Sequence, residues 1–115
     1  MGNKDDSLTV LWTSGDREIA LNMMFMYLSN ARPQGWWEEV TLIIWGPSAK
    51  LSAGDEEIQK GLTKLKELGV KLEACVVCAE RYGVVDDLEE LGIDVYGMGQ
   101  PLTEAIKGEK SVITF

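Results

Sequence analysis

Apolar runs alternate with amphipathic segments along the chain, and this alternation is the feature that most restricts its fold. The runs cover residues 8–12, 40–45, 71–77, 93–96 and 111–115. They are short and bounded by turn-forming residues, as buried strands are. Strands that alternate with helices in this way form a parallel sheet with helices on both faces. We therefore expect one α/β domain over residues 1–115, a three-layer α/β/α sandwich with a parallel five-stranded sheet.

Helix start and stop signals predict four helices between these strands. They are expected over residues 17–30 and 56–68, through residues 84–92, and from Pro101 to the residue before Gly108. Asp16 is a suitable N-cap for the first of these helices. Ser52 and Asp55 have capping-box spacing ahead of the second helix. Four helices and five strands account for the whole length with short connections.

The first expected helix carries apolar side chains on every side. Met23, Met24, Phe25, Met26, Tyr27 and Leu28 follow one another over almost two turns, and Trp36 and Trp37 come soon after. A helix that covers one side of a sheet normally keeps a polar outer face. This helix is therefore either deeply buried or covered by a second copy of the chain. The small size of the domain favours the second copy, and we expect a homo-oligomer.

Composition excludes several classes of partner. The net charge of −8 is opposite to that of nucleic-acid-binding proteins, which have a basic face, and it disfavours anionic membrane surfaces. No apolar run approaches the roughly 20 residues that span a bilayer. The segment 1–7 is polar and acidic, unlike a signal peptide. We expect a protein of the cytoplasm, where cysteines are kept reduced.

The sequence has no histidine, which excludes catalysis by Ser–His and Cys–His pairs and by a histidine general base. The two cysteines supply only half of a tetrahedral zinc site. We therefore expect neither a metal nor a cofactor.

Both cysteines, Cys75 and Cys78, lie in one C-x-x-C motif. The motif joins an expected strand to an expected helix, where the positive end of the helix dipole favours thiolate over thiol. Thiolate is the form that attacks sulfur, so Cys75 and Cys78 are the candidate catalytic residues. The alternative is that they are small buried apolar side chains, a common role of free cysteine.

Ligands of parallel α/β sheets bind beyond the carboxyl ends of the strands. Four connections reach that edge here, and their candidate ligand-binding residues are Ser14, Gly15, Ser48, Lys50, Arg81, Gly97 and Gly99. Backbone amides at Ser14 and Gly15 could hold an anion, although Ser and Gly also make an ordinary turn and cap there. Lys50 and Arg81 could stabilise a thiolate or persulfide, or could be solvated surface charges.

The cysteine closing the third strand, with glycine eight residues later at Gly83, resembles the DsrE/DsrF-like family of sulfur-relay proteins. The small glycine-containing loop at 97–100 fits the same family, and the resemblance covers essentially the whole chain. Segments 11–16 and 45–48 resemble a small, mostly uncharacterised subgroup. The resemblance implies a flavodoxin-like or Rossmann-like fold, trimers or hexamers, and a persulfide carried by Cys75.

The sequence therefore predicts a sulfur-relay protein that takes sulfane sulfur onto Cys75 and passes it to a partner thiol. Cys78 would either resolve the persulfide as a disulfide or be a spare buried thiol. Two alternatives remain open. One is a non-catalytic binding or assembly module with structural cysteines, and the other is a thiol–disulfide oxidoreductase that cycles the C-x-x-C pair.

Overall fold

Five parallel strands form one sheet in the computed structural model, which describes residues 6–108 and 110–115. The strands are β1 (Ser7–Trp12), β2 (Glu39–Ile44), β3 (Lys71–Cys75), β4 (Asp94–Tyr96) and β5 (Ser111–Thr114). Their order across the sheet is β4-β3-β2-β1-β5, and every neighbouring pair is parallel. The expected parallel five-stranded sheet is confirmed, and periodicity in the sequence could not have given its strand order.

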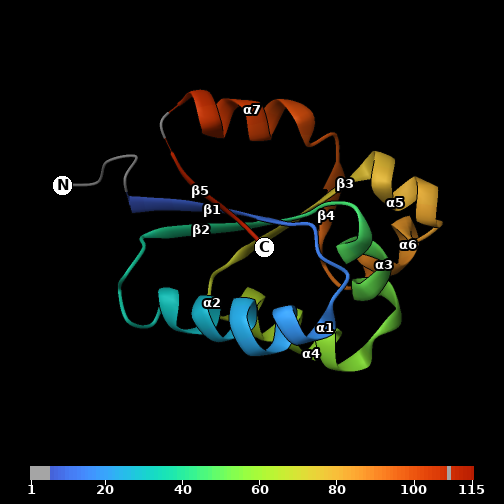
Figure 1. Cartoon of the computed structure of the whole chain (residues 1–115), viewed down its shortest axis with the longest axis horizontal. Helices are drawn as coiled ribbons and strands as arrows, with labels where there is room; N and C mark the ends of the chain where they lie inside the picture. Colours follow the sequence, from blue (N-terminus) through green and yellow to red (C-terminus); the bar gives the residue numbers. More distant parts are fainter. Residues whose placement is uncertain (1–5, 109) are drawn as a thin grey trace.

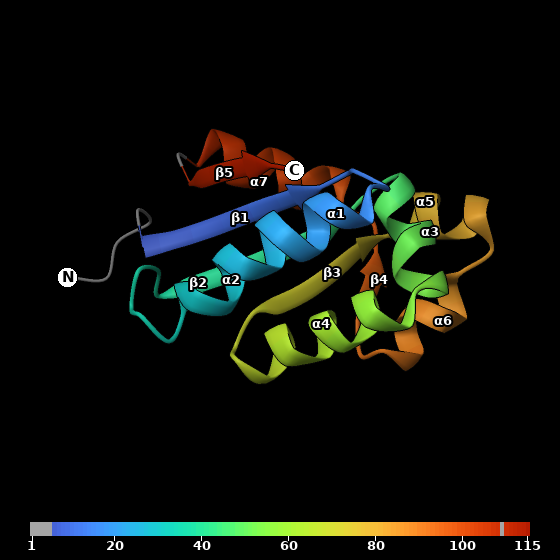
Figure 2. The same cartoon turned by 60° about the horizontal axis from the view of Figure 1, so that its bottom comes forward.

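Helices cover both faces of the sheet, as a three-layer sandwich requires (Figure 1). The helical segments are α1 (Arg17–Ile19), η2 (Ala20–Met24), α2 (Phe25–Ala31), α3 (Pro47–Gly54), α4 (Glu56–Glu67), α5 (Val76–Tyr82), α6 (Val85–Glu90) and α7 (Gly99–Lys107). Figure 2 shows α1, α2 and α4 together on one face, whereas α7 lies on the other. The short helices α3, α5 and α6 gather beyond the carboxyl ends of the strands.

The main core lies between the sheet and the layer formed by α2 and α4. Alternate residues of the central strands point into it, among them Val10, Trp12, Leu42 and Ile44, each 0 % exposed. Helix residues with 3.6-residue spacing pack against these strand residues. From α4 they are Ile58, Leu62 and Leu65. The opposite sheet face carries a mixed set of side chains under α7, among them Ile43, Glu73 and Cys75.

The first helix differs from the expected one by a π-helical turn. The chain is helical from Arg17 to Ala31, but residues Ala20–Met24 form a π turn between two α-helical pieces. Asp16 is the N-cap, as expected, and its carboxylate accepts the Glu18 N–H at 2.8 Å. Apolar side chains are divided between two sides of this helix: Met24 and Leu28 are buried, whereas Met26 is exposed.

Other boundaries were wrong in the sequence-based prediction. β3 ends at Cys75 rather than residue 77, and residues 76 and 77 belong to α5, which ends at Gly83 in a left-handed conformation with φ 69°. The helix expected through residues 84–92 is present as α6. The chain also contains an unexpected helix, α3, and Ser52 lies inside it. The second helix is therefore capped by Asp55 alone, which accepts the N–H groups of Glu57 and Ile58. α7 begins at Gly99, ahead of Pro101.

One glycine in the middle of α4 is explained by close packing. A Cβ at Gly61 would overlap the ring of Phe25, which is itself 8 % exposed and held in the core. We expect Gly61→Ala to destabilise the fold by about 1–3 kcal/mol, in spite of the better helix propensity of alanine. Urea unfolding measures this loss.

The matched control is Gly54→Ala in α3, where a Cβ meets nothing within 4 Å. It should leave stability unchanged or raise it by up to about 1 kcal/mol. Equal stabilities of the two variants would contradict the contact between α4 and Phe25.

No helix in the described part of the chain is both long and apolar enough to cross a membrane. The prediction that residues 1–7 are not a signal peptide falls largely outside the described residues, which begin at residue 6.

Candidate functional site

The C-x-x-C motif lies at the junction of β3 and α5, beyond the carboxyl edge of the sheet. Cys75 is the last residue of β3 and the N-cap residue of α5, with extended backbone angles. Cys78 follows within the first turn of α5, so the chain turns back and brings the second thiol beside the first. Both cysteines are free thiols.

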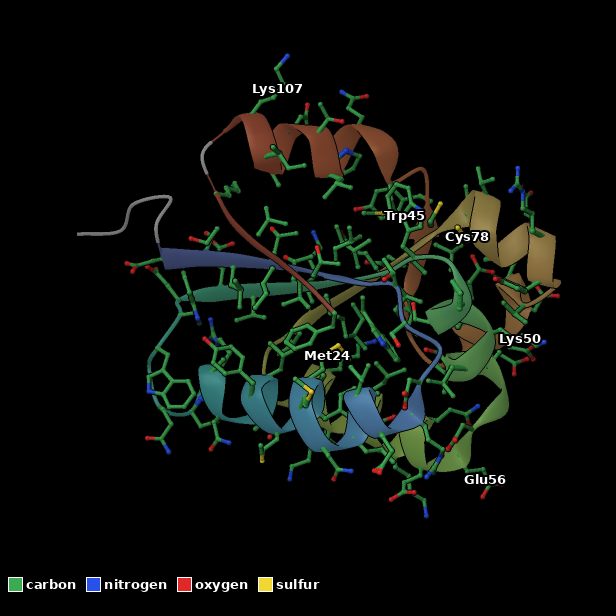
Figure 3. The ribbon with its side chains drawn as sticks, viewed as in Figure 1. Met24, Trp45, Lys50, Glu56, Cys78 and Lys107 are labelled. Atoms are coloured by element: carbon green, nitrogen blue, oxygen red, sulfur yellow. The ribbon has the colours of Figure 1, made fainter. Side chains whose placement is uncertain are left out.

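Cys75 lies on the α7 side of the sheet in a small apolar cluster. Its side chain is 6 % exposed and packs with Ile43 of β2 and Met98, which are both at least 98 % buried. Trp45 and Cys78 border the same cluster and are partly buried (Figure 3). The Cys75 thiol is therefore largely shielded from solvent, and Met98 is one of the side chains that pack around it.

The thiol of Cys78 is held largely in its protonated form. Partial removal from water raises the pKa of the Cys78 thiol, and the neighbouring Cys75 thiol raises it further. The backbone amide of Gly46 and the positive charge of Arg81 act in the opposite direction. The Cys75 thiol therefore affects the ionisation of Cys78, and the turn after β2 contributes an amide to the site.

The candidate ligand-binding residues do not form one site. Ser14 accepts the Asp16 N–H at 3.1 Å, which is a local turn contact. Gly15 and Lys50 border a shallow cavity of about 360 Å³ beside Pro47. Arg81 is exposed on α5.

Ser48 is 0 % exposed, and its hydroxyl donates to the Trp12 carbonyl at 2.5 Å and accepts the Trp45 N–H at 3.1 Å. These contacts tie the ends of β1 and β2 together. Gly97 and Gly99 flank Met98, and a Cβ at either glycine would meet nothing within 4 Å. The structure therefore connects these two glycines to Cys75 through Met98.

Sequence reasoning missed a buried carboxylate near Cys75, together with its tyrosine partner. Glu73 lies two residues before Cys75 on the same face of β3 and is only 4 % exposed. Tyr96 pairs with Cys75 in the register of β3 and β4, and its hydroxyl donates to Oε2 of Glu73. Lys71 Nζ approaches the same oxygen at 3.2 Å. The period-two spacing of residues 71, 73 and 75 is the signal that could have revealed this group.

The contact with Glu73 raises the pKa of Tyr96 to about 12, mainly through the hydrogen bond and then through burial. Because the folded pKa is raised, the contribution to stability is complete below about pH 10 and disappears as the pH rises through about 12. We expect the tyrosinate absorbance of the native protein to include a component titrating near pH 12.

Tyr96→Phe should remove this component, and Glu73→Gln should move it to lower pH. If the wild-type and Tyr96→Phe proteins ionise identically in that range, the hydrogen bond is not present in solution.

Within the described ranges 6–108 and 110–115, no group of three or more Cys, Asp or Glu side chains is arranged to hold a metal ion. The site is thus a thiol pair under a methionine, bordered by a buried carboxylate and a tyrosine.

A parallel α/β domain with a cysteine closing its third strand defines the class of protein. The DsrE/DsrF-like family model matches residues 12–115, so the chain belongs to the DsrE/DsrF-like family. The match covers nearly the whole described structure and confirms the resemblance that the sequence suggested.

Two solved structures share the fold. A conserved protein of unknown function from Bacteroides thetaiotaomicron, BT1422, is 38% identical, with a TM-score of 0.94 over 96% of this chain and 95% of that one. A protein of unknown function from Methanobacterium thermoautotrophicum, MTH1491, is 21% identical, with a TM-score of 0.70 over 95% of this chain and 98% of that one. No curated protein matches the chain.

Proposed function

We propose that the protein is a sulfur-relay protein, which carries sulfane sulfur as a persulfide on Cys75. The observation that supports this most strongly is the thiol pair itself: Cys75 closes β3 under Met98, and Cys78 lies beside it. Membership of the DsrE/DsrF-like family adds to this support, because a cysteine at this position resembles the persulfide cysteine of its sulfur-relay members.

The transfer consists of two similar substitutions at sulfur. The Cys75 thiolate attacks the outer sulfur of a donor persulfide, R–S–SH. A bond forms between the Cys75 sulfur and that outer sulfur, and the bond between the two donor sulfurs breaks. The donor thiolate leaves with the electron pair. An acceptor thiolate then attacks the outer sulfur on Cys75 in the same way, takes it as a persulfide, and restores the Cys75 thiolate.

Cys78 has one chemical role in this transfer. Its thiolate can attack the inner sulfur of the Cys75 persulfide, which forms the Cys75–Cys78 disulfide and releases hydrosulfide. Because burial raises the pKa of the Cys78 thiol, this attack is slow at neutral pH, and the persulfide survives long enough to be passed on.

Access to Cys75 requires movement of the loop between β4 and α7. Met98 is 1 % exposed and packs in the same cluster as Cys75, and a Cβ at the adjacent Gly97 or Gly99 would meet nothing within 4 Å. Glycines on both sides allow this loop to swing and uncover the sulfur. In this proposal Gly97 and Gly99 serve the site as hinges.

The sulfur relay and two alternative functions predict different masses of the intact protein after treatment. After incubation with inorganic polysulfide, the relay predicts a gain of one sulfur atom. A thiol–disulfide oxidoreductase, which the C-x-x-C pair also suits, predicts loss of two hydrogens under mild oxidant and no retained sulfur. A non-catalytic binding module predicts an unchanged mass under both conditions, and that outcome would exclude the relay.

The proposal also includes self-association, as a trimer or hexamer. Met23, Met26 and Trp36 are between 53% and 61% exposed, and Tyr27 stacks on Trp36 with ring centroids 5.6 Å apart. We call these four residues the Met26 patch. Apolar side chains that gather in this way on a soluble protein normally mark a contact surface, and a second copy of the chain is the occupant we propose. The compartment we propose is the cytoplasm, where both thiols stay reduced.

A further inference from the structure

The sheet face beneath α7 contains a polar cavity that neither the thiol pair nor the core explains. It has a volume of about 380 Å³ and lies between α7 and strands β1 to β4. Its lining includes Thr9, Thr41, Glu73 and Tyr96 from four neighbouring strands. Parallel sheets are normally apolar on both faces, so polar residues on four strands in a row are unusual.

Glu73 is the residue that most requires an explanation. A carboxylate that is 4 % exposed is costly to bury, and an apolar side chain would fill the same space at no such cost. Its contacts with Tyr96 and Lys71 both involve Oε2. Oε1 takes part in neither contact, so it is the oxygen left for a ligand. Three carboxylates against two ammonium groups in the cavity lining favour a ligand group with a positive charge, in spite of the ion pair with Lys71.

The charges around the cavity specify the rest of the ligand. Three carboxylates line it, from Glu39, Glu73 and Glu104, and two ammonium groups, from Lys71 and Lys110. Lys110 is exposed and lies toward the opening, whereas Lys71 Nζ is 3.2 Å from Oε2 of the buried Glu73. A molecule with an ammonium group at the buried end and a carboxylate at the open end complements this arrangement, and 380 Å³ accommodates a small one.

The cavity ends where the Cys75 cluster begins. Ile43 lines the cavity and also packs against Cys75. Glu73 and Cys75 are two residues apart on one strand face, which corresponds to about 7 Å. In a cysteine-type persulfide the ammonium nitrogen and the outer sulfur are about 5 Å apart, and a hydrogen bond to Glu73 supplies the remaining length. The outer sulfur then reaches Cys75 once Met98 moves.

We propose that this cavity binds a small zwitterionic thiol compound of the cysteine type, with its ammonium group on Oε1 of Glu73 and its carboxylate near Lys110. This rests on the proposed sulfur-relay function, for which it names the donor class: an amino-acid persulfide. Its outer sulfur passes to the Cys75 thiolate, and the amino-acid thiolate leaves with the electron pair of the broken sulfur–sulfur bond.

Binding is tested first without sulfur transfer. S-methylcysteine has the same ammonium and carboxylate groups but cannot give up its sulfur. Titrated into the amide-labelled full chain and followed by NMR, it should shift the Thr41, Glu73 and Tyr96 amides with a Kd of about 1 mM. Methylthiopropionate, which lacks the ammonium group, should bind about tenfold more weakly.

Glu73→Gln keeps the size of the side chain and removes its charge, and it should weaken S-methylcysteine binding about tenfold. Glu67→Gln, which removes the same charge from α4 on the other side of the sheet, should change the affinity less than about twofold. The proposal is overturned if these amides do not shift, or if Glu73→Gln binds as tightly as Glu67→Gln.

Measurements of sulfur loading then distinguish the proposed donor site from the proposed sulfur-relay function. The rate of persulfide formation from cysteine persulfide, divided by the rate from inorganic polysulfide, should fall about tenfold in Glu73→Gln. An unchanged ratio overturns the cavity as the donor site. No loading from either donor, together with normal S-methylcysteine binding, overturns the relay function and leaves the binding site in place.

Discussion

Cys75→Ser should abolish persulfide formation, so that its intact mass stays unchanged after incubation with inorganic polysulfide. The hydroxyl of serine cannot attack sulfane sulfur at neutral pH, whereas the fold around a buried, nearly isosteric side chain should be kept. Cys78→Ser is the matched variant, one turn along the same motif. It should still gain one sulfur atom, because the Cys75 thiol remains.

The two variants also define the role of Cys78. If it resolves the persulfide, the loaded Cys78→Ser protein should release hydrosulfide more slowly than wild type and form no intramolecular disulfide. Equal loading of Cys75→Ser and wild type would contradict the assignment of the sulfur to Cys75. If Cys75→Ser gains a sulfur atom and Cys78→Ser does not, the carrier role belongs to Cys78, which is the more exposed of the two thiols.

Met26→Lys should convert the oligomer to a monomer. Met26 is 61% exposed and belongs to the Met26 patch, and a lysine from each copy would place like charges in the proposed contact. Light scattering should give three or six times the chain mass of 12.7 kDa for wild type, and close to 12.7 kDa for the variant. The expected three- or sixfold change in molar mass is easily distinguished.

Ile106→Lys is the control, since Ile106 on α7 is 59% exposed and lies on the other side of the sheet. It introduces the same charge and removes a similar apolar area, and it should leave the oligomer intact. A monomeric wild-type protein would show that the Met26 patch is simply exposed. Dissociation by Ile106→Lys rather than Met26→Lys would move the interface to the α7 side.

The sequence predicts the class of this fold and most of its strands because burial on both faces leaves a clear pattern. The runs around Val10 and Leu42 are apolar at nearly every position, as strands between two helical layers must be. Boundaries were less accurate where local propensity conflicts with tertiary packing. Val76 and Val77 favour a strand, yet they lie in α5 because the chain turns at Cys75 to cover the sheet edge.

The first helix shows a similar limit. Its consecutive apolar residues predicted a side covered by a second copy but not which side, because the π turn at Ala20–Met24 changes the side that each residue occupies. Met24 and Leu28 then face the core, and Met26 faces outward. Nothing in the residue pattern announces a π turn, so the exposed patch could be located only from the structure.

The cysteine pair was identified from sequence because cysteine is rare in the chain and both residues share one motif. Glu73 was missed because a single acidic residue in an apolar run resembles an exposed edge position. Its burial depends on Tyr96 and Lys71 in the folded sheet, and only the strand order β4-β3-β2 brings Tyr96 next to it.

The relay itself is tested most directly by following the sulfur after it has been loaded. Wild-type protein is treated with isotopically labelled polysulfide, freed of donor, and mixed with an excess of a small thiol. Intact-mass measurement should show the protein returning to its unmodified mass while the labelled sulfur appears as a persulfide on the added thiol. A protein that keeps its sulfur, or that loses it only as free hydrosulfide with formation of the Cys75–Cys78 disulfide, would contradict the account.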